Sequence, residues 1–198
     1  MVKHELPPES PVSAAALVKM GRHPGPFVLA LDDQTDAVAR VSCDEVVRAI
    51  PGKRLVCRGA WQGRAVYTKV YMGPDKDWHT ERRGLQALHE QGIAAPALLH
   101  AGTADDGALH VIILAAIEPA QTLAQAWEQA NDEAEHIQLL RLAVTTIARH
   151  HRAGLEQGDI HLNNFLLSGG RLYTLDGGGI RSSGEAGLSL RRSRDNLA

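Results

Sequence analysis

The part of this chain that most constrains its fold is a polar loop, residues 158–164, together with the residues that follow it. Asp159 and Asn164 lie five positions apart within this loop. Two short apolar runs separated by Ser-Gly-Gly then make residues 165–175 a candidate β-hairpin. Because a hairpin returns the chain to its starting edge, Asp176 would come back beside Asn164. The pattern therefore predicts two carboxylates and one carboxamide at one edge of a small sheet.

This set of side chains suits phosphoryl transfer to a hydroxyl group. Asp159 would orient the attacking hydroxyl and accept its proton, while Asn164 and Asp176 would hold Mg²⁺ against phosphate oxygens. The glycines at 177–179 would give a sharply turning backbone access to positive φ and remove every Cβ near the phosphates. The alternative is a hairpin whose polar residues only cap backbone groups. The flanking apolar runs and the second Asp favour the phosphoryl-transfer site.

The residues around this loop also resemble a known family. The resemblance rests on His151, on Gly-Asp-Ile-His-Leu-Asn-Asn-Phe-Leu-Leu at 158–167 and on Leu-Asp-Gly-Gly-Gly-Ile at 175–180. They resemble the protein-kinase-like superfamily and, within it, the bacterial lipopolysaccharide core kinases of the Kdo/WaaP/InaA family. Protein kinases typically carry Arg before the first Asp and Lys after it, whereas small-molecule kinases share the Gly-Asp-x-His form. The resemblance covers roughly residues 45–198.

The resemblance implies an α+β, protein-kinase-like fold with two lobes and the use of ATP and Mg²⁺. We expect an N-terminal extension at 1–40, a small antiparallel-sheet lobe that binds nucleotide at 41–118, and a mainly helical catalytic lobe at 119–198. The chain ends soon after Asp176, where kinase-like folds normally continue with further helices. The helical lobe is therefore expected to be incomplete.

Lys69 and Glu81 are the candidate upstream members of the site. Lys69 lies in the middle of a predicted strand at 65–71, and Glu81 shares a predicted helix face with Leu85 and Leu88. A Glu on the buried face of a helix is costly unless a cation meets it. Lys69 would supply that cation and would itself contact the α- and β-phosphates. The alternative is a surface Lys and a solvated Glu.

Two other segments are candidates for nucleotide contacts. The connection predicted at 59–64 between two strands contains Gly59 and Gly63, which would offer backbone N–H groups to the phosphates, although an ordinary hairpin turn explains them equally well. Ile117 and Glu118 lie where the chain would cross between lobes. In the superfamily, backbone groups at that crossing bind adenine.

The helical lobe is predicted from caps and periodicity. A capping box begins a helix at Thr122, and a longer helix runs from about 132–134 to 153. We expect that helix to pack under the loop at 158–164, with helically spaced apolar positions at Ile137, Leu140, Val144, Ile147 and Ala148. Residues 180–187 are predicted to form a mobile loop.

Several charged or titratable residues allow more than one interpretation. His161 would help to neutralise the γ-phosphate or would be purely structural. His150 and His151 end the long helix, where the helix dipole favours a charged His, and we prefer this to a metal site. The basic cluster of Arg191, Arg192 and Arg194 would approach a phosphorylated glycolipid or an anionic membrane, or would begin a solvated helix.

Composition limits the partners. Net charge is −2 and aromatics are 4%, so neither a basic field nor base-stacking platforms indicate nucleic acid. Cys43 and Cys57 are isolated and fit a reducing cytoplasm as small buried hydrophobes. The N-terminus lacks the apolar run of a signal peptide. We expect a cytoplasmic protein and leave peripheral contact with the inner membrane, and the oligomeric state, open.

These observations predict an ATP-dependent kinase that phosphorylates a sugar hydroxyl, in the lipopolysaccharide inner core. Its partners would be a nucleotide and a sugar or glycolipid acceptor. Two alternatives stay open: a kinase of another small molecule, such as an aminoglycoside or choline-like alcohol, and a catalytically silent protein that binds nucleotide or serves as a scaffold.

Overall fold

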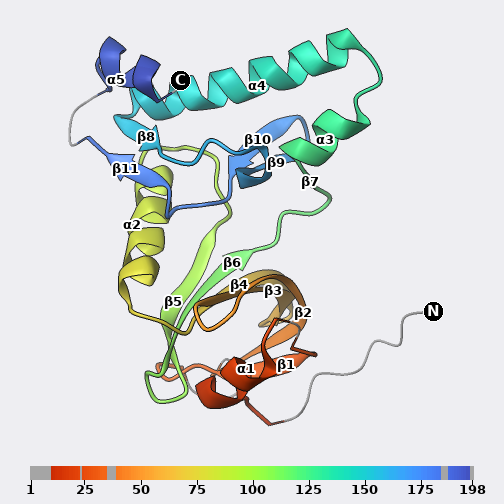
Figure 1. Cartoon of the computed structure of the whole chain (residues 1–198), viewed down its shortest axis with the longest axis vertical. Coiled ribbons are helices and arrows are strands. Elements are labelled where there is room, and N and C mark those ends of the chain that lie inside the picture. The colour runs from red at the N-terminus through yellow and green to blue at the C-terminus, as the bar shows by residue number, and fades with distance from the viewer. Residues whose placement is uncertain (1–9, 23, 35–38, 184–186, 197–198) are drawn as a thin grey trace. The chain divides into compact units, whose positions relative to one another are not determined.

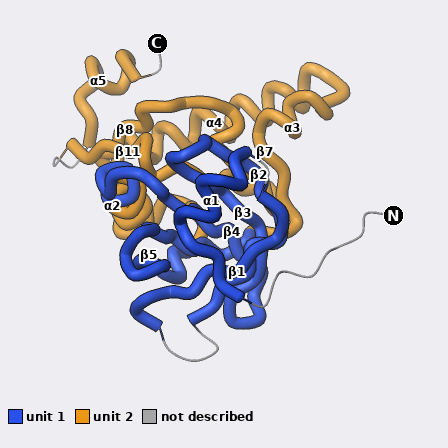
Figure 2. The backbone as a smooth tube through the Cα atoms, turned by 60° about the horizontal axis from the view of Figure 1, so that its bottom comes forward, with its two compact units in different colours: residues 1–79, 97–116 blue, residues 80–96, 117–198 orange. Residues whose placement is uncertain are grey.

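The structure is a computed structural model that describes residues 10–22, 24–34, 39–183 and 187–196. The chain forms two compact units, which Figure 2 colours separately. Unit 1 comprises residues 1–79 and 97–116, and unit 2 comprises residues 80–96 and 117–198. Residues 1–9 of the predicted extension, 184–186 of the predicted mobile loop and 197–198 of the last predicted helix lie outside the described residues.

Unit 1 is built on one antiparallel sheet of six strands (Figure 1). In spatial order these are β1 (Phe27–Ala30), β2 (Arg40–Ile50), β3 (Arg54–Trp61), β4 (Arg64–Tyr71), β6 (Leu109–Ala115) and β5 (Leu98–Ala104). A short helix, α1 (Ala14–Met20), begins at Ser13, whose side chain accepts from the Ala16 N–H. The antiparallel small-lobe sheet that the sequence predicts is thus present, and β1 adds to it a strand from the segment before residue 41.

The core of unit 1 collects the inward side chains of these strands. Leu55, Val66, Val70 and Val111 are fully buried in it. Cys43 and Cys57 belong to the same cluster as free, buried thiols, as predicted. The contact with the Cys57 side chain, and then burial, raise the pKa of the Cys43 thiol well above its ordinary value.

The turn between β3 and β4 is shorter than predicted. It consists of Gln62 and Gly63 alone, both with positive φ (51° and 72°), as a two-residue type I′ hairpin requires. Gly59 lies inside β3, paired with Cys43 on one side and Val66 on the other. A Cβ on Gly59 would lie 1.9 Å from the Ser42 carbonyl oxygen, so close strand packing explains this glycine. The predicted loop at 59–64 was therefore too long.

Helix α2 (Lys76–Glu90) passes from unit 1 into unit 2. At its beginning, the indole N–H of Trp78 donates to the Val111 carbonyl (3.1 Å) in unit 1. In unit 2, Glu81, Leu85 and Leu88 are completely buried, which confirms the predicted helix face. Leu88 packs there with residues from β8 and β11, among them Leu155 and Ile180.

Unit 2 combines helices with two small antiparallel sheets. One sheet has the order β10 (Arg171–Thr174), β9 (Phe165–Ser168) and β7 (Gln121–Thr122), and the other pairs β11 (Ile180–Ser182) with β8 (Leu155–Gln157). The helices are α3 (Leu123–Gln129), α4 (Glu133–Arg152), the 3₁₀ turn η2 (Leu162–Asn164) and α5 (Leu190–Asp195). The predicted capping box is present at Thr122 and Gln125. Figure 1 shows α4 lying across β8 and β10.

Two predictions for unit 2 were wrong. The buried face of α4 carries Leu139, Thr146, Ile147, His150 and His151, whereas the predicted positions Ile137, Leu140 and Val144 are 39%, 51% and 59% exposed. Apolar spacing alone could not distinguish these faces, because the helix carries polar residues into its buried side. Ile180–Ser182 forms strand β11 against β8 instead of belonging to a mobile loop.

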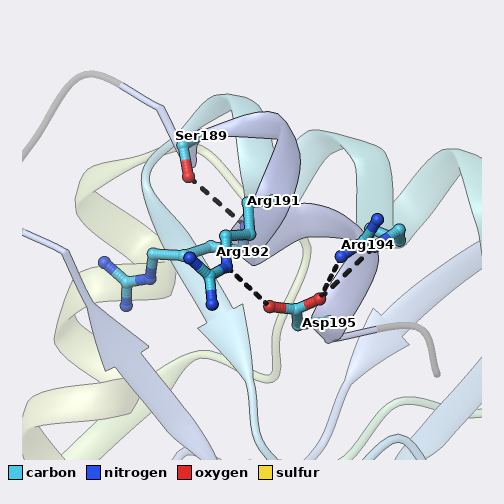
Figure 3. Close-up of polar contacts among 5 residues, drawn as sticks. All are labelled: Ser189, Arg191, Arg192, Arg194 and Asp195. Atoms are coloured by element: carbon cyan, nitrogen blue, oxygen red, sulfur yellow. Dashed lines mark hydrogen bonds and ion pairs between the residues drawn. The ribbon is translucent and has the colours of Figure 1, made fainter.

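The basic cluster near the chain's end lies on α5 and is partly neutralised within the chain. Arg191 and Arg194 contact Asp195 at 3.8 and 3.2 Å, as Figure 3 shows. Arg192 forms a 2.9 Å ion pair with Glu156 of β8. The Ser189 hydroxyl caps the helix. Among the described helices, none is long and apolar enough to cross a membrane.

Candidate active site

The polar loop at residues 158–164 follows β8 and closes on itself through Asn164. The side-chain amide Nδ2 of Asn164 donates to the Asp159 carboxylate Oδ2 (3.0 Å) and to the Asp159 carbonyl (3.1 Å). The Asn164 N–H donates to the His161 carbonyl (2.8 Å), which closes the 3₁₀ turn. Asp159 is exposed and Asn164 is 8% exposed. The loop thus presents a carboxylate of fixed orientation to solvent.

The hairpin brings the second Asp to the same edge, as predicted. In the β9–β10 register Phe165 pairs with Thr174, and the Leu175 N–H donates to the Asn164 carbonyl (2.9 Å). Asp176 is the next residue, so Asn164 and Asp176 flank the open end of one hairpin. At the closed end, Gly169 and Gly170 both adopt positive φ (54° and 74°).

These residues fit a hard divalent cation. Because Asn164 uses Nδ2 toward Asp159, its oxygen Oδ1 faces no hydrogen-bond donor among the described residues. An amide oxygen and a carboxylate are ligands that Mg²⁺ accepts, and Mg²⁺ commonly takes only one or two protein carboxylates. In the described part of the chain, no three His, Cys, Asp or Glu side chains gather as a metal cluster. Asn164 and Asp176 are the residues that would hold the ion.

Glu81 anchors the loop after Asp176. Its two carboxylate oxygens accept from the N–H groups of Gly177 (3.1 Å) and Gly178 (2.9 Å). The Gly178 N–H is shared with the Asp176 carboxylate Oδ1 (3.0 Å). Backbone donors therefore satisfy a fully buried carboxylate, and the carboxylate in turn holds the turn that presents Asp176. Sequence reasoning assigned Glu81 a partner in Lys69 and missed this contact.

None of the glycines at 177–179 has positive φ, and close packing against helix α2 explains Gly177. A Cβ on Gly177 would lie 2.4 Å from the Glu81 carbonyl oxygen. A Cβ on Gly84, one turn further along α2, would lie 1.8 Å from the Gly177 carbonyl oxygen. The predicted need for positive φ here was wrong. Helix α2 explains the missing Cβ of Gly177, and the predicted closeness of these glycines to the phosphates stays a prediction.

The remaining nucleotide candidates lie in both units. Lys69 is buried in β4 (9% exposed) and belongs to unit 1, whereas Glu81 belongs to unit 2, so their pairing stays a prediction. Gly63 lies in the β3–β4 turn of unit 1. Ile117 and Glu118 begin the last segment of unit 2, immediately after the chain leaves unit 1. The contacts of Lys69, Gly63, Ile117 and Glu118 with a nucleotide stay predictions.

The three histidines near the loop have structural partners. His161 is exposed, and its Nδ1 accepts from the Asn163 N–H (3.2 Å) as the cap of the 3₁₀ turn. Nε2 of the fully buried His150 lies 3.1 Å from the Thr174 hydroxyl. Burial, and to a smaller extent the neighbouring His151, lower the pKa of His150 to about 4. A charged His150 at the helix dipole was therefore the wrong interpretation. His151 Nε2 lies 2.9 Å from the Asn196 side-chain oxygen.

Sequence reasoning missed Gln157. It is completely buried at the end of β8, two residues before Asp159, and its side-chain Nε2 donates to the Asp159 carbonyl (3.2 Å). The available signal was its position, a polar residue at the end of the strand that leads into the loop.

The comparisons with known proteins fit this arrangement. The model of the lipopolysaccharide kinase (Kdo/WaaP) family matches residues 67–176, which include Lys69, Glu81, Asp159, Asn164 and Asp176. No curated protein sequence matches the chain significantly.

Two solved structures show the fold. One is WaaP in complex with acyl carrier protein, with 22% identity and a TM-score of 0.52 over 77% of this chain and 67% of that chain. The other is the BubR1 kinase domain, with 15% identity and a TM-score of 0.60 over 80% of this chain and 51% of that chain. The chain thus has a protein-kinase-like fold and spans about half of the BubR1 kinase domain and two thirds of WaaP. Because the family model covers more than half of its residues, the chain belongs to the lipopolysaccharide kinase (Kdo/WaaP) family.

Proposed function

We propose that this protein is an ATP-dependent kinase that transfers the γ-phosphate to a sugar hydroxyl of the lipopolysaccharide inner core. The observation that carries the proposal is the open end of the β9–β10 hairpin. There Asn164 holds the Asp159 carboxylate by a 3.0 Å hydrogen bond, and the Leu175 N–H to Asn164 carbonyl bond sets Asp176 beside it. A base and two oxygen ligands at one edge are what phosphoryl transfer to an alcohol requires.

Asp159 would act on the acceptor. One carboxylate oxygen, Oδ2, accepts from Asn164, and the other takes no hydrogen bond from the described residues. That second oxygen would accept the proton of the attacking hydroxyl as the new O–P bond forms. The exposure of Asp159 gives an acceptor of sugar size access to it. The bond to Asn164 would keep the carboxylate from rotating away.

Asn164 and Asp176 would bind Mg²⁺, which when bound neutralises charge on the phosphate oxygens. The contacts from Glu81 to Gly177 and Gly178 would keep Asp176 in place for this task. Because those donors are backbone groups, they cannot adopt alternative rotamers. This gives the metal-binding end of the hairpin a rigid support.

The remaining predicted residues would bind the nucleotide. Lys69 would contact the α- and β-phosphates with Glu81 as its partner, and the backbone N–H of Gly63, in the β3–β4 turn, would approach the phosphates. Backbone groups of Ile117 and Glu118 would bind adenine. His161, exposed in the same loop as Asp159, would help to neutralise the γ-phosphate.

The family supports the acceptor class, because its model describes lipopolysaccharide kinases. Phosphorylation of a core sugar by ATP would occur on the cytoplasmic side of the inner membrane, where the nucleotide is available. The ion pairs of α5 with Asp195 and Glu156 leave Arg191 and Arg194 highly exposed (86% and 79%), as a contact with a phosphorylated glycolipid would require.

The test is phosphate transfer from ATP to purified core oligosaccharide, followed by ³¹P NMR of the product. We expect Asp159→Ala to abolish transfer and to leave Mg-ATP binding, measured by thermal shift, nearly unchanged. Asp77→Asn, an exposed carboxylate on α2, is the matched control and should behave like the wild type. Wild-type transfer by Asp159→Ala would refute the role of this residue. Binding of Mg-ATP without transfer by the wild type would favour a silent nucleotide-binding protein.

A further inference from the structure

Gln157 is a buried polar residue at the junction of the two loops that carry the site. It is the last residue of β8 and has no exposed surface. Strand β8 pairs with β11, and Ile180 of β11 lies opposite Gln157. The chain continues from Gln157 into the Asp159 loop, residues 158–164. The glycine loop, residues 177–179, is distant in sequence and lies beside the Gln157 side chain. Gln157 therefore lies between two segments that strands β9 and β10 separate in the sequence.

Its side chain contacts the Asp159 loop through a single carbonyl group. Nε2 of Gln157 donates to the Asp159 carbonyl at 3.2 Å. The same carbonyl accepts from the His161 N–H (3.0 Å) and from Nδ2 of Asn164 (3.1 Å). Three donors thus converge on one oxygen, and this oxygen belongs to the residue whose side chain would act as the base. Its position fixes the main chain of Asp159.

The same side chain packs against the glycine loop. A Cβ on Gly179 would lie 3.2 Å from Gln157 Nε2, so this glycine lets the amide group fit closely. Next to it, the Gly158 N–H donates to the Gly179 carbonyl at 2.8 Å. Side chain and main chain therefore join the Asp159 loop and the glycine loop at adjacent points.

The main chain of Gln157 is held by Asn196, the residue that caps the C-terminal end of α5. Asn196 Nδ2 donates to the Gln157 carbonyl at 2.7 Å, and its oxygen lies 2.9 Å from His151 Nε2. The Arg192–Glu156 ion pair ties the same helix to the preceding residue of β8. Gln157 is thus anchored on its main chain and uses its side chain to reach the loops.

The buried amide has a cost that a purely packing residue would avoid. Oε1 of Gln157 has no hydrogen-bond partner among the described residues, and an unsatisfied buried polar atom is destabilising. An apolar side chain of the same length would fill the space without that cost. What it would lack is the donor to the Asp159 carbonyl.

We propose that Gln157 is a positioning residue of this site, whose side-chain N–H holds the Asp159 main chain against the glycine loop so that Asp159 and Asp176 keep their relative position. This role rests on the proposed kinase function, since it is defined by the alignment of the base with the metal-binding carboxylate. Gln157 touches neither phosphate nor acceptor in this assignment.

The test compares two substitutions of nearly equal length. Gln157→Met removes the donor, and we expect kcat for phosphate transfer to fall about 10- to 100-fold with little change in KM for ATP. Gln157→Glu carries a donor only when its carboxyl group is protonated, and burial raises the pKa of a carboxyl group. Its kcat relative to wild type should therefore recover as the pH is lowered. Gln138→Met, on the exposed side of α4, is the matched control and should retain wild-type kcat.

A second readout does not depend on activity. Amide hydrogen exchange in peptides covering 158–164 and 176–180 should become faster in Gln157→Met and stay unchanged in Gln138→Met. If the wild type transfers no phosphate, the proposed function fails, and the exchange data still decide whether Gln157 holds the two loops. Wild-type kcat together with unchanged exchange in Gln157→Met would overturn the proposal. It would also be overturned if the kcat of Gln157→Glu, divided by that of the wild type, did not vary with pH.

Discussion

His150 gives the molecule an acid-sensitive stability whose size follows from the structure. The side chain is completely buried at the end of α4, and Nε2 lies 3.1 Å from the Thr174 hydroxyl of β10. Its other nitrogen, Nδ1, has no hydrogen-bond partner among the described residues. Burial, and secondly the charge of His151, lower the pKa of His150 from 6.5 to about 4. The folded protein therefore keeps this imidazole neutral where the unfolded chain would protonate it.

The direction of the effect follows from proton binding. Between pH 6.5 and about pH 4 the unfolded state binds a proton at His150 that the folded state does not, so the free energy of unfolding falls as the pH falls. Each pKa unit corresponds to about 1.4 kcal/mol, and the shift therefore corresponds to a loss of about 3 kcal/mol across this range. Above pH 6.5 the penalty is absent. Below about pH 4 the folded state also binds the proton and the loss stops growing.

Urea unfolding at pH 7 and pH 4.5 measures this loss. His150→Gln keeps a polar group near Thr174 and cannot be protonated, so we expect its stability to fall less between the two pH values, by about 2–3 kcal/mol relative to wild type. His79→Gln, an exposed His on α2, should follow the wild-type pH dependence. An identical pH dependence of the wild type and His150→Gln would refute the assignment of a buried, neutral imidazole.

Three further substitutions test how α2 and the caps support the site. In an exposed helix, a Gly→Ala substitution is stabilising. At Gly84, however, the new Cβ would lie 1.8 Å from the Gly177 carbonyl oxygen, so we expect Gly84→Ala to lower the free energy of unfolding in urea by about 1–3 kcal/mol. A higher free energy of unfolding would refute the close approach. Glu81→Gln leaves one oxygen for two backbone donors, and hydrogen exchange at Gly177 and Gly178 should become faster; unchanged exchange would contradict the anchor. Thr122→Ala removes the α3 cap and should lower the free energy of unfolding by about 1 kcal/mol in the same assay. An unchanged free energy of unfolding would contradict the role of this cap.

Much of the local structure was predictable, because each feature is encoded within a few neighbouring residues. The Ser-Gly-Gly turn specifies the β9–β10 hairpin, and a hairpin necessarily returns Asp176 to Asn164. The face of α2 that carries Glu81 followed from its spacing with Leu85 and Leu88, and all three are fully buried. The capping box at Thr122 was likewise a local signal.

The errors concern features that depend on distant segments. Strand β11 exists because Ile180 finds β8 as a partner, and nothing within 180–187 reveals that partner. The buried face of α4 includes His150 and Thr146, which hydrophobic periodicity assigns to solvent. Gly59 is explained by the carbonyl of Ser42 on the neighbouring strand, whereas the sequence pattern suggested a loop. In each case the deciding contact lies far away along the chain.

Glu81 shows how the two kinds of information combine. Its position on a buried helix face predicted a cationic partner, and Lys69, in the middle of a predicted strand, was the candidate. The structure shows two backbone donors, Gly177 and Gly178, at 3.1 and 2.9 Å, which already satisfy one lone pair on each oxygen. A carboxylate offers about four acceptor sites, so a Lys partner and the glycine loop do not compete for it. In the proposed function the same side chain would orient the phosphate-binding Lys and would also hold the turn after Asp176, so helix α2 would support the metal-binding edge of the proposed site.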